Sequence, residues 1–273
     1  LTSSLMYNHK FYPSLHGKRI IAGVNYINDK SGDAKLSINH IELAAAYEQD
    51  YFENTFSAGF QVGFIHKQFS DAKLTFPEQY DRGIGDFNNS IASGENFAAN
   101  EFGKMQINLG LGWKRILNEK WTVQTGVSFF NLNRAAGGFT EWDKPQKLAY
   151  CIQFLASHQL LKYTELRPSI EYRRSSAASE LLLGSNIYQK LLDAKLDGLF
   201  GGLHFRNGIS RNNDAVILNA GLSFGAFDFG ASYDFNVSDL QMASNYRGGL
   251  EFILIITEVA MQLQQKTIPC ERY

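Results

Sequence analysis

The sequence has no hydrophobic run that is long enough to form a membrane-spanning helix. The longest uninterrupted apolar stretch covers residues 252–256, whereas a transmembrane helix needs roughly 20 apolar residues in succession. The mean hydropathy of the chain is −0.23. This slightly polar average counts against a helical membrane protein, but it is compatible with a membrane barrel, whose strands are apolar on one face only.

Cysteine is nearly absent, and neither sign of charge is in excess. The two cysteines, Cys151 and Cys270, cannot make a disulfide framework, and they are interpreted as free thiols or as one isolated bond. The formal net charge is −1 in 273 residues. The overall balance therefore gives no reason to expect a nucleic-acid partner.

The sequence also lacks the motifs of common enzymes and metal sites. Its 6 histidines are scattered, and neither an HExxH pattern nor a GxSxG motif occurs. Gly83 and Gly85 form only a fragment of a dinucleotide-binding loop. Asp29 and Asp33 lie in a polar turn whose spacing does not match an EF-hand, so a plain turn is favoured over a calcium site. We therefore expect no catalytic residue, no cofactor and no metal.

What the sequence does contain is alternation of apolar and polar residues with a period of two. Such alternation indicates β-strands with one apolar face and one polar or glycine-rich face. It is clearest at residues 56–64, 105–113, 122–129 and 227–235. In the first of these segments the apolar residues are Phe56, Ala58, Phe60, Val62 and Phe64, and between them stand Ser57, Gly59, Gln61 and Gly63.

The same reading along the whole chain predicts thirteen strands, each long enough to cross a bilayer when tilted, at roughly 9–11 residues per crossing. Residues 40–48 and 181–192 could also form helices, because they are rich in Leu, Ala and Glu. The other strands are expected near residues 2–10, 18–28, 36–49, 147–160, 163–174, 177–190, 196–206, 214–224 and 246–258.

The connections between these strands alternate between short and long. Short turns at one end of the strands and long loops at the other are typical of an outer-membrane barrel. The short connections are residues 12–17, 50–55, 117–120, 161–163, 192–195 and 225–226. The longer ones are residues 28–35, 70–100, 134–146, 208–213 and 237–245.

The fold expected from these features is an all-β, antiparallel, up-and-down transmembrane barrel over residues 1–258, followed by a tail, residues 259–273. In lipid only a closed barrel satisfies every backbone group of a sheet, and closed bacterial barrels of one chain have an even number of strands. Leu1 is not a start methionine. We therefore expect a longer precursor with a further strand before Leu1, which gives about 14 strands.

The polar faces of the strands are expected to line the lumen of the barrel, and the apolar faces to meet lipid. The inward glycines would leave room for something to fold inside, and the long loop 70–100 is the expected plug or cap. The polar residues expected in the lumen are Gln61, Asn108, Gln124, Glu171, Asp228, Asp234 and Glu251.

An ordered set of short motifs resembles the PorP/SprF family of outer-membrane proteins, which occur with the type IX secretion system. The resemblance covers nearly the whole chain, and the ordered set is specific although each motif alone is weak. The motifs are NDKSGD (28–33), KLTF (73–76) with Gln79 and Asp81, SGEN (93–96), NLNR (131–134), LRPSIEY (166–172), ELLLGSN (180–186), DAVI (214–217), SYDFNVSDL (232–240) and PCERY (269–273).

The resemblance implies a non-enzymatic partner of type IX secretion that helps to export or anchor a secreted adhesin-like protein, in some members for gliding motility. Long loops would be extracellular and would bind the adhesin or its C-terminal domain, whereas short turns and the C-terminus would be periplasmic. Loops on a rigid scaffold commonly carry binding. The loop residues expected to contact the client are Phe76, Tyr80, Asp81, Phe87, Phe97, Phe139, Trp142 and Asp239.

The tail would lie in the periplasm, where Cys270, Arg272 and Tyr273 would contact other type IX components. The loop aromatics have an equally good alternative role, which is to pack the loops on the barrel. A channel or transporter for small molecules, including hydrophobic ones, is the alternative function. A soluble β-protein is the remaining alternative, and extraction without detergent would identify it.

Overall fold

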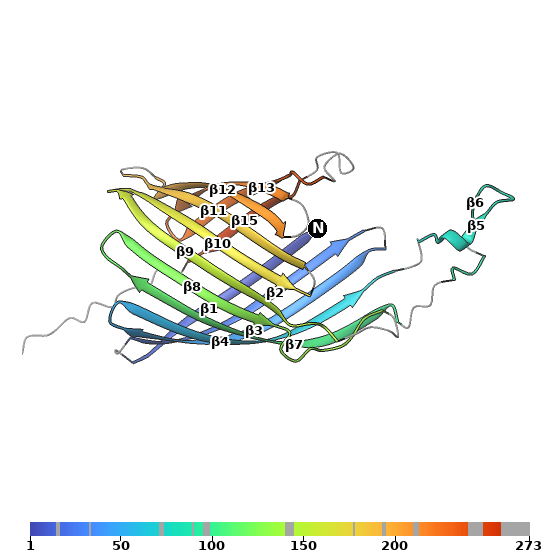
Figure 1. Ribbon diagram of the computed structural model, residues 1–273, viewed down its shortest axis with the longest axis horizontal. Helices are drawn as coiled ribbons and strands as arrows, with labels where there is room; N and C mark the ends of the chain where they lie inside the picture. The colour runs from blue at the N-terminus through green and yellow to red at the C-terminus, as the bar shows by residue number, and fades with distance from the viewer. Residues whose placement is uncertain are drawn as a thin grey trace, which may run out of the picture.

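The computed structural model consists of one large antiparallel sheet that curls around a hollow (Figure 1). It describes residues 1–14, 17–32, 34–70, 74–88, 90–94, 99–139, 145–176, 178–192, 195–209, 213–239 and 248–257. None of the helices in this part of the chain combines the length and the apolar character needed to cross a membrane.

The large sheet contains thirteen strands, and each is hydrogen-bonded to its neighbours in chain order. This confirms the number and the order of the strands expected from the period-two pattern. Residues 40–48 and 181–190 are strand rather than helix. The strands are β1 (Thr2–Ser14), β2 (Lys18–Ser31), β3 (Leu36–Tyr51), β4 (Asn54–Gln68), β7 (Glu101–Ile116), β8 (Trp121–Phe130), β9 (Ala149–Leu161), β10 (Thr164–Ser175), β11 (Ala178–Lys190), β12 (Gly198–Ile209), β13 (Asn213–Phe224), β14 (Phe227–Asn236) and β15 (Leu250–Ile256).

A second, two-stranded sheet lies within the long connection between β4 and β7. It consists of β5 (Tyr80–Asp81) and β6 (Asp86–Phe87), and a single 3₁₀ turn, η1 (Pro77–Gln79), precedes it. Figure 1 shows this small hairpin projecting from the long-loop end of the large sheet, away from the hollow.

The two edges of the large sheet run in the same direction. The backbone N–H of Lys30 bonds to the carbonyl of Leu1 at the long-loop end of β1, and the N–H of Thr257 bonds to the carbonyl of Ala226 at the short-turn end of β15. Among the described residues neither β1 nor β15 has a strand on its outer edge. A strand antiparallel to both edges could pair with each of them because they run in the same direction, and the strand expected before Leu1 stays a prediction.

Burial on the sheet is the reverse of that in a soluble protein. The outward faces expose large apolar side chains along every strand, for example Leu43, Phe60 and Leu203 at 63%, 48% and 56%. In the described part of the chain the buried polar residues outnumber the buried apolar ones. The buried apolar residues are Ile65, Ala156 and Ala215, and the buried polar ones are Ser37, Glu42, Gln79, Lys104, Asn108 and Ser223.

This arrangement suits a sheet that is surrounded by lipid. An apolar band that faces outward and a polar inner face are the pattern of a transmembrane barrel. The expected lumen residues behave accordingly, since the side-chain amide of Asn108 donates to Gln61 at 3.0 Å across β4 and β7.

Candidate functional site

The inner wall carries a charged network close to the short turns of β1–β4. The guanidinium of Arg19, at the start of β2, donates from both terminal nitrogens to the carboxylate of Asp50, at 2.5 and 2.6 Å. Its Nε donates to Glu48 at 2.8 Å. Thr55 donates its hydroxyl to Asp50 at 2.7 Å, and Lys10 Nζ lies 3.4 Å from Glu48. The network therefore joins four consecutive strands of the barrel wall.

Local sequence explains why these side chains meet. In each strand the charged residue occupies an inward position of the period-two pattern, and antiparallel register places Arg19 opposite Glu48 and Asp50 opposite Thr55. Charged side chains on the outward face at this depth would lie against lipid or its headgroups, whereas the lumen admits water. Sequence reasoning missed these residues, although inward charges next to short turns were a usable signal.

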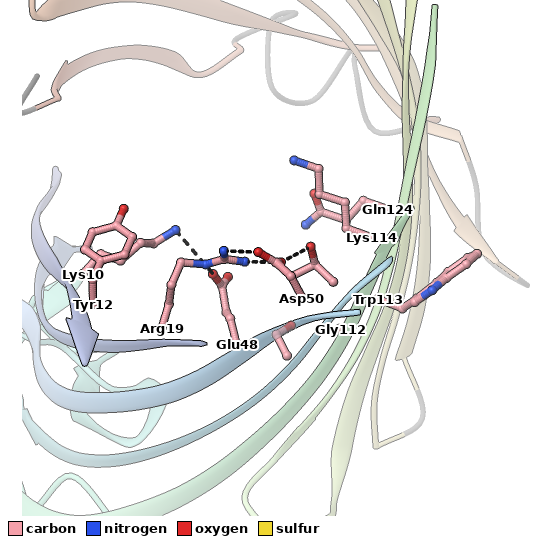
Figure 2. Close-up of a pocket in the computed structure, with 11 residues that line it drawn as sticks. Lys10, Tyr12, Arg19, Glu48, Asp50, Gly112, Trp113, Lys114 and Gln124 are labelled. Atoms are coloured by element: carbon pink, nitrogen blue, oxygen red, sulfur yellow. Dashed lines mark hydrogen bonds and ion pairs between the residues drawn. The ribbon is translucent and has the colours of Figure 1, made fainter. Parts of the chain in front are cut away.

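A cavity of about 500 Å³ lies over this network. Figure 2 shows Lys10, Arg19, Glu48, Asp50, Lys114 and Gln124 on its inner side, and Trp113 pointing outward through the wall. Its walls are supplied by β1, β2, β3, β4, β7 and β8, so it belongs to the lumen face of half of the large sheet.

The loop after β8 folds back on the inner wall at the long-loop end. The N–H of Asn131 donates to Asn108 Oδ1 at 3.1 Å, and Gln106 donates to the side chain of Asn131. Phe139 packs edge-on against Phe69 and Phe102, with ring centroids 4.7 and 4.9 Å apart. Phe139 thus packs its loop on the barrel, and its contact with a client stays a prediction.

The described parts of the loop expected to be a plug or cap do not lie against the inner wall. The described parts of residues 70–100 project away from the barrel (Figure 1), while the loop 131–139 lies against β7. The position of the loop 131–139 depends on its contacts with the inner residues of β7, and the lengths of the loops could not predict these contacts.

Two of the inward glycines make room for side chains of the neighbouring strand. A Cβ added to Gly184 would lie 2.0 Å from the ring of His204, and one added to Gly202 would lie 1.9 Å from the side chain of Asn186. The space beside these glycines is thus occupied by side chains of the neighbouring strand.

The hairpin β5–β6 brings together several residues that were expected to bind a partner. The rings of Tyr80 and Phe87 pack edge to face with centroids 5.4 Å apart. Asp81 accepts the N–H of Gly83 at 2.7 Å, and Gln79 accepts the N–H of Phe76 at 3.1 Å and donates to the carbonyl of Ile91 at 3.0 Å. The hairpin is therefore an ordered unit with its own small aromatic cluster.

Among the described residues, the predicted contact Asp239 is not brought to this cluster. Asp239 is exposed in the connection that follows β14. Phe97, Trp142, Cys270, Arg272 and Tyr273 lie outside the described residues. Cys151 is a half-buried free thiol on β9. Within the described ranges, no three His, Cys, Asp or Glu side chains are grouped to hold a metal ion.

Comparison with known proteins agrees with this architecture. The family model of the type IX secretion system membrane protein PorP/SprF matches residues 2–255. A search of curated proteins gave no match. The matched range includes all thirteen strands of the sheet, and only the last residue of β15 lies beyond it. The chain belongs to the PorP/SprF family of type IX secretion system membrane proteins.

Proposed function

We propose that this protein is a non-enzymatic outer-membrane partner of type IX secretion that assists the export or surface anchoring of an adhesin-like protein. The long loops face the outside and bind the adhesin or its C-terminal domain. The short turns face the periplasm, and the barrel contacts outer-membrane lipid. In a gliding cell the anchored adhesin would serve motility.

The observation that carries this proposal is the hairpin β5–β6. Tyr80, Ile84 and Phe87 are 47%, 65% and 44% exposed, although they project beyond the barrel, where no lipid covers them. Exposed aromatic and aliphatic side chains held on an ordered element are typical of protein-binding surfaces. Asp81 and Asp86 stand beside them and add a charged rim.

The double substitution Tyr80→Ser with Phe87→Ser is expected to reduce the amount of client at the cell surface. Loss of aromatic anchors from an interface costs about 2 kcal/mol or more, which lowers the affinity for the client at least about tenfold. Client that reaches the surface is measured by protease accessibility. A photo-crosslinking residue in place of Ile84 should join the barrel to the secreted protein.

The matched control is Phe52→Ser in the short turn between β3 and β4. Phe52 is 85% exposed, but it lies at the opposite end of the strands, so surface export should not change. Equal export by the hairpin variant and the wild type, with no crosslink from position 84, would exclude the hairpin as the client site.

We further propose that residues 259–273 form a periplasmic tail that contacts other type IX components through Cys270, Arg272 and Tyr273. The position of Thr257 at the short-turn end supports this placement. Deletion of residues 261–273 should reduce the recovery of those components in a pull-down from mild detergent. Unchanged recovery would refute the tail contact.

A channel for small molecules is the second candidate function, and the cavity of about 500 Å³ on the polar inner wall favours it. Conductance across planar bilayers distinguishes the two functions. A large and steady open conductance would support the channel. Electrical silence, together with crosslinking of a secreted protein at position 84, would support the partner.

A further inference from the structure

We propose that the cavity over the short-turn network binds a small anion that carries carboxylate or phosphate groups. This site is separate from the loops that are proposed to bind a client. It rests on the cations and hydrogen-bond donors that remain available after the internal pairing of the network is complete.

The two carboxylates of the cavity are already satisfied. Asp50 accepts two bonds from the guanidinium of Arg19 and one from the hydroxyl of Thr55. Glu48 accepts the Nε–H of Arg19 and lies 3.4 Å from Lys10 Nζ. A guanidinium held in this way by two carboxylates has little capacity left for a ligand, so this group braces the wall.

One positive group of the cavity remains without an ion pair. The cavity is lined by the three cations Lys10, Arg19 and Lys114 against the two carboxylates Glu48 and Asp50. Lys114 has no ion pair among the described residues. Lys10 is paired with Glu48, so the unpaired positive charge of the cavity belongs to Lys114, and in a wall of low dielectric this charge favours a counter-ion.

Hydrogen-bond donors line one open space, and the ammonium of Lys10 has further N–H groups beside the one that faces Glu48. Figure 2 shows the amino groups of Lys10 and Lys114 on opposite sides of the brace, with that of Lys10 turned toward Glu48 and the amide of Gln124 beside Lys114. Tyr12 adds a hydroxyl at the rim of the same cavity. Ammonium, amide and hydroxyl groups that converge in this way are the donors that bind carboxylate and phosphate oxygens.

The position of the cavity indicates the route of entry. The loop 131–139 lies against β7 at the long-loop end, whereas the cavity lies beside the short turns of β1–β4 and β7–β8. An anion would therefore enter from the short-turn mouth. A volume of about 500 Å³ accommodates a solute of the size of phosphate or a small tricarboxylate with part of its hydration water.

Titration calorimetry of the full chain in an uncharged detergent tests the site, with inorganic phosphate and citrate as separate probes. We expect saturable binding of at least one probe, and weaker binding at higher sodium chloride concentrations. Binding of phosphate alone would assign the natural ligand to phosphate compounds, and binding of citrate alone would assign it to carboxylates.

Lys114→Gln should weaken that binding about tenfold, because a charge-assisted hydrogen bond is lost. Lys120→Gln is the matched control, since Lys120 lies in the β7–β8 turn at the same end but does not line the cavity. Its affinity should stay within about twofold of the wild type. Lys10→Gln provides a second, independent variant, and heat-dependent mobility on gels confirms that each variant is folded.

Two results would overturn the proposal. One is the absence of saturable binding of either probe to the folded wild type. The other is an equal loss of affinity in the folded variants at positions 114 and 120, which would indicate only a general surface charge.

Discussion

Ala45→Arg is expected to destabilise the folded barrel by about 2–4 kcal/mol, the cost of a cation on the lipid face near the middle of a bilayer. Ala44→Arg, one residue earlier on β3, is expected to cost much less. Ala45 is exposed on the outward face, opposite Phe60, whereas Ala44 lies opposite Gln61 on the inward face and lines the lumen cavities.

The two alanines form a matched pair because they share depth, strand and residue type. Successive residues of a strand point to opposite faces, so only the environment of the new charge differs. The free energy of unfolding is measured by urea titration in lipid vesicles, with tryptophan fluorescence as the signal. Equal destabilisation by both substitutions would contradict the assignment of the apolar face to lipid.

Arg19→Met is expected to lower the free energy of unfolding by about 1–3 kcal/mol. The substitution keeps most of the side-chain length but leaves Glu48 and Asp50 without the cation that holds them together. Removal of one partner of a fully buried ion pair costs about 3–5 kcal/mol. The cost expected here is smaller because the side chains of Arg19, Glu48 and Asp50 are 18%, 21% and 37% exposed to solvent.

Lys18→Met is the matched control because Lys18 precedes Arg19 on the same strand and is exposed on the other face. Its effect should stay within about 0.5 kcal/mol. A double-mutant cycle with Asp50→Asn should give a coupling energy of at least about 0.5 kcal/mol between positions 19 and 50. Additive effects of the two substitutions would show that the network contributes nothing to stability.

The strands and their two faces could be predicted from the sequence because both depend on local alternation. In β4, Phe56, Phe60 and Phe64 are exposed, and Ser57 and Gln61 are partly buried between them. No contact with a distant residue is needed to decide which face each side chain takes. The family resemblance was equally available, since it depends on the order of motifs along the chain.

The charged network and the placement of the loops were decided only by the tertiary structure. Arg19 and Asp50 are 31 residues apart, and they meet because β2 and β3 pair in one particular register. The loop 131–139 lies against the inner wall because Asn131 and Phe139 find partners on β7 and at Phe69, just after β4. The described part of the longer loop forms its own hairpin outside. Hydrophobic alternation determines which residues face the lumen, but the register of the sheet determines which of those residues touch.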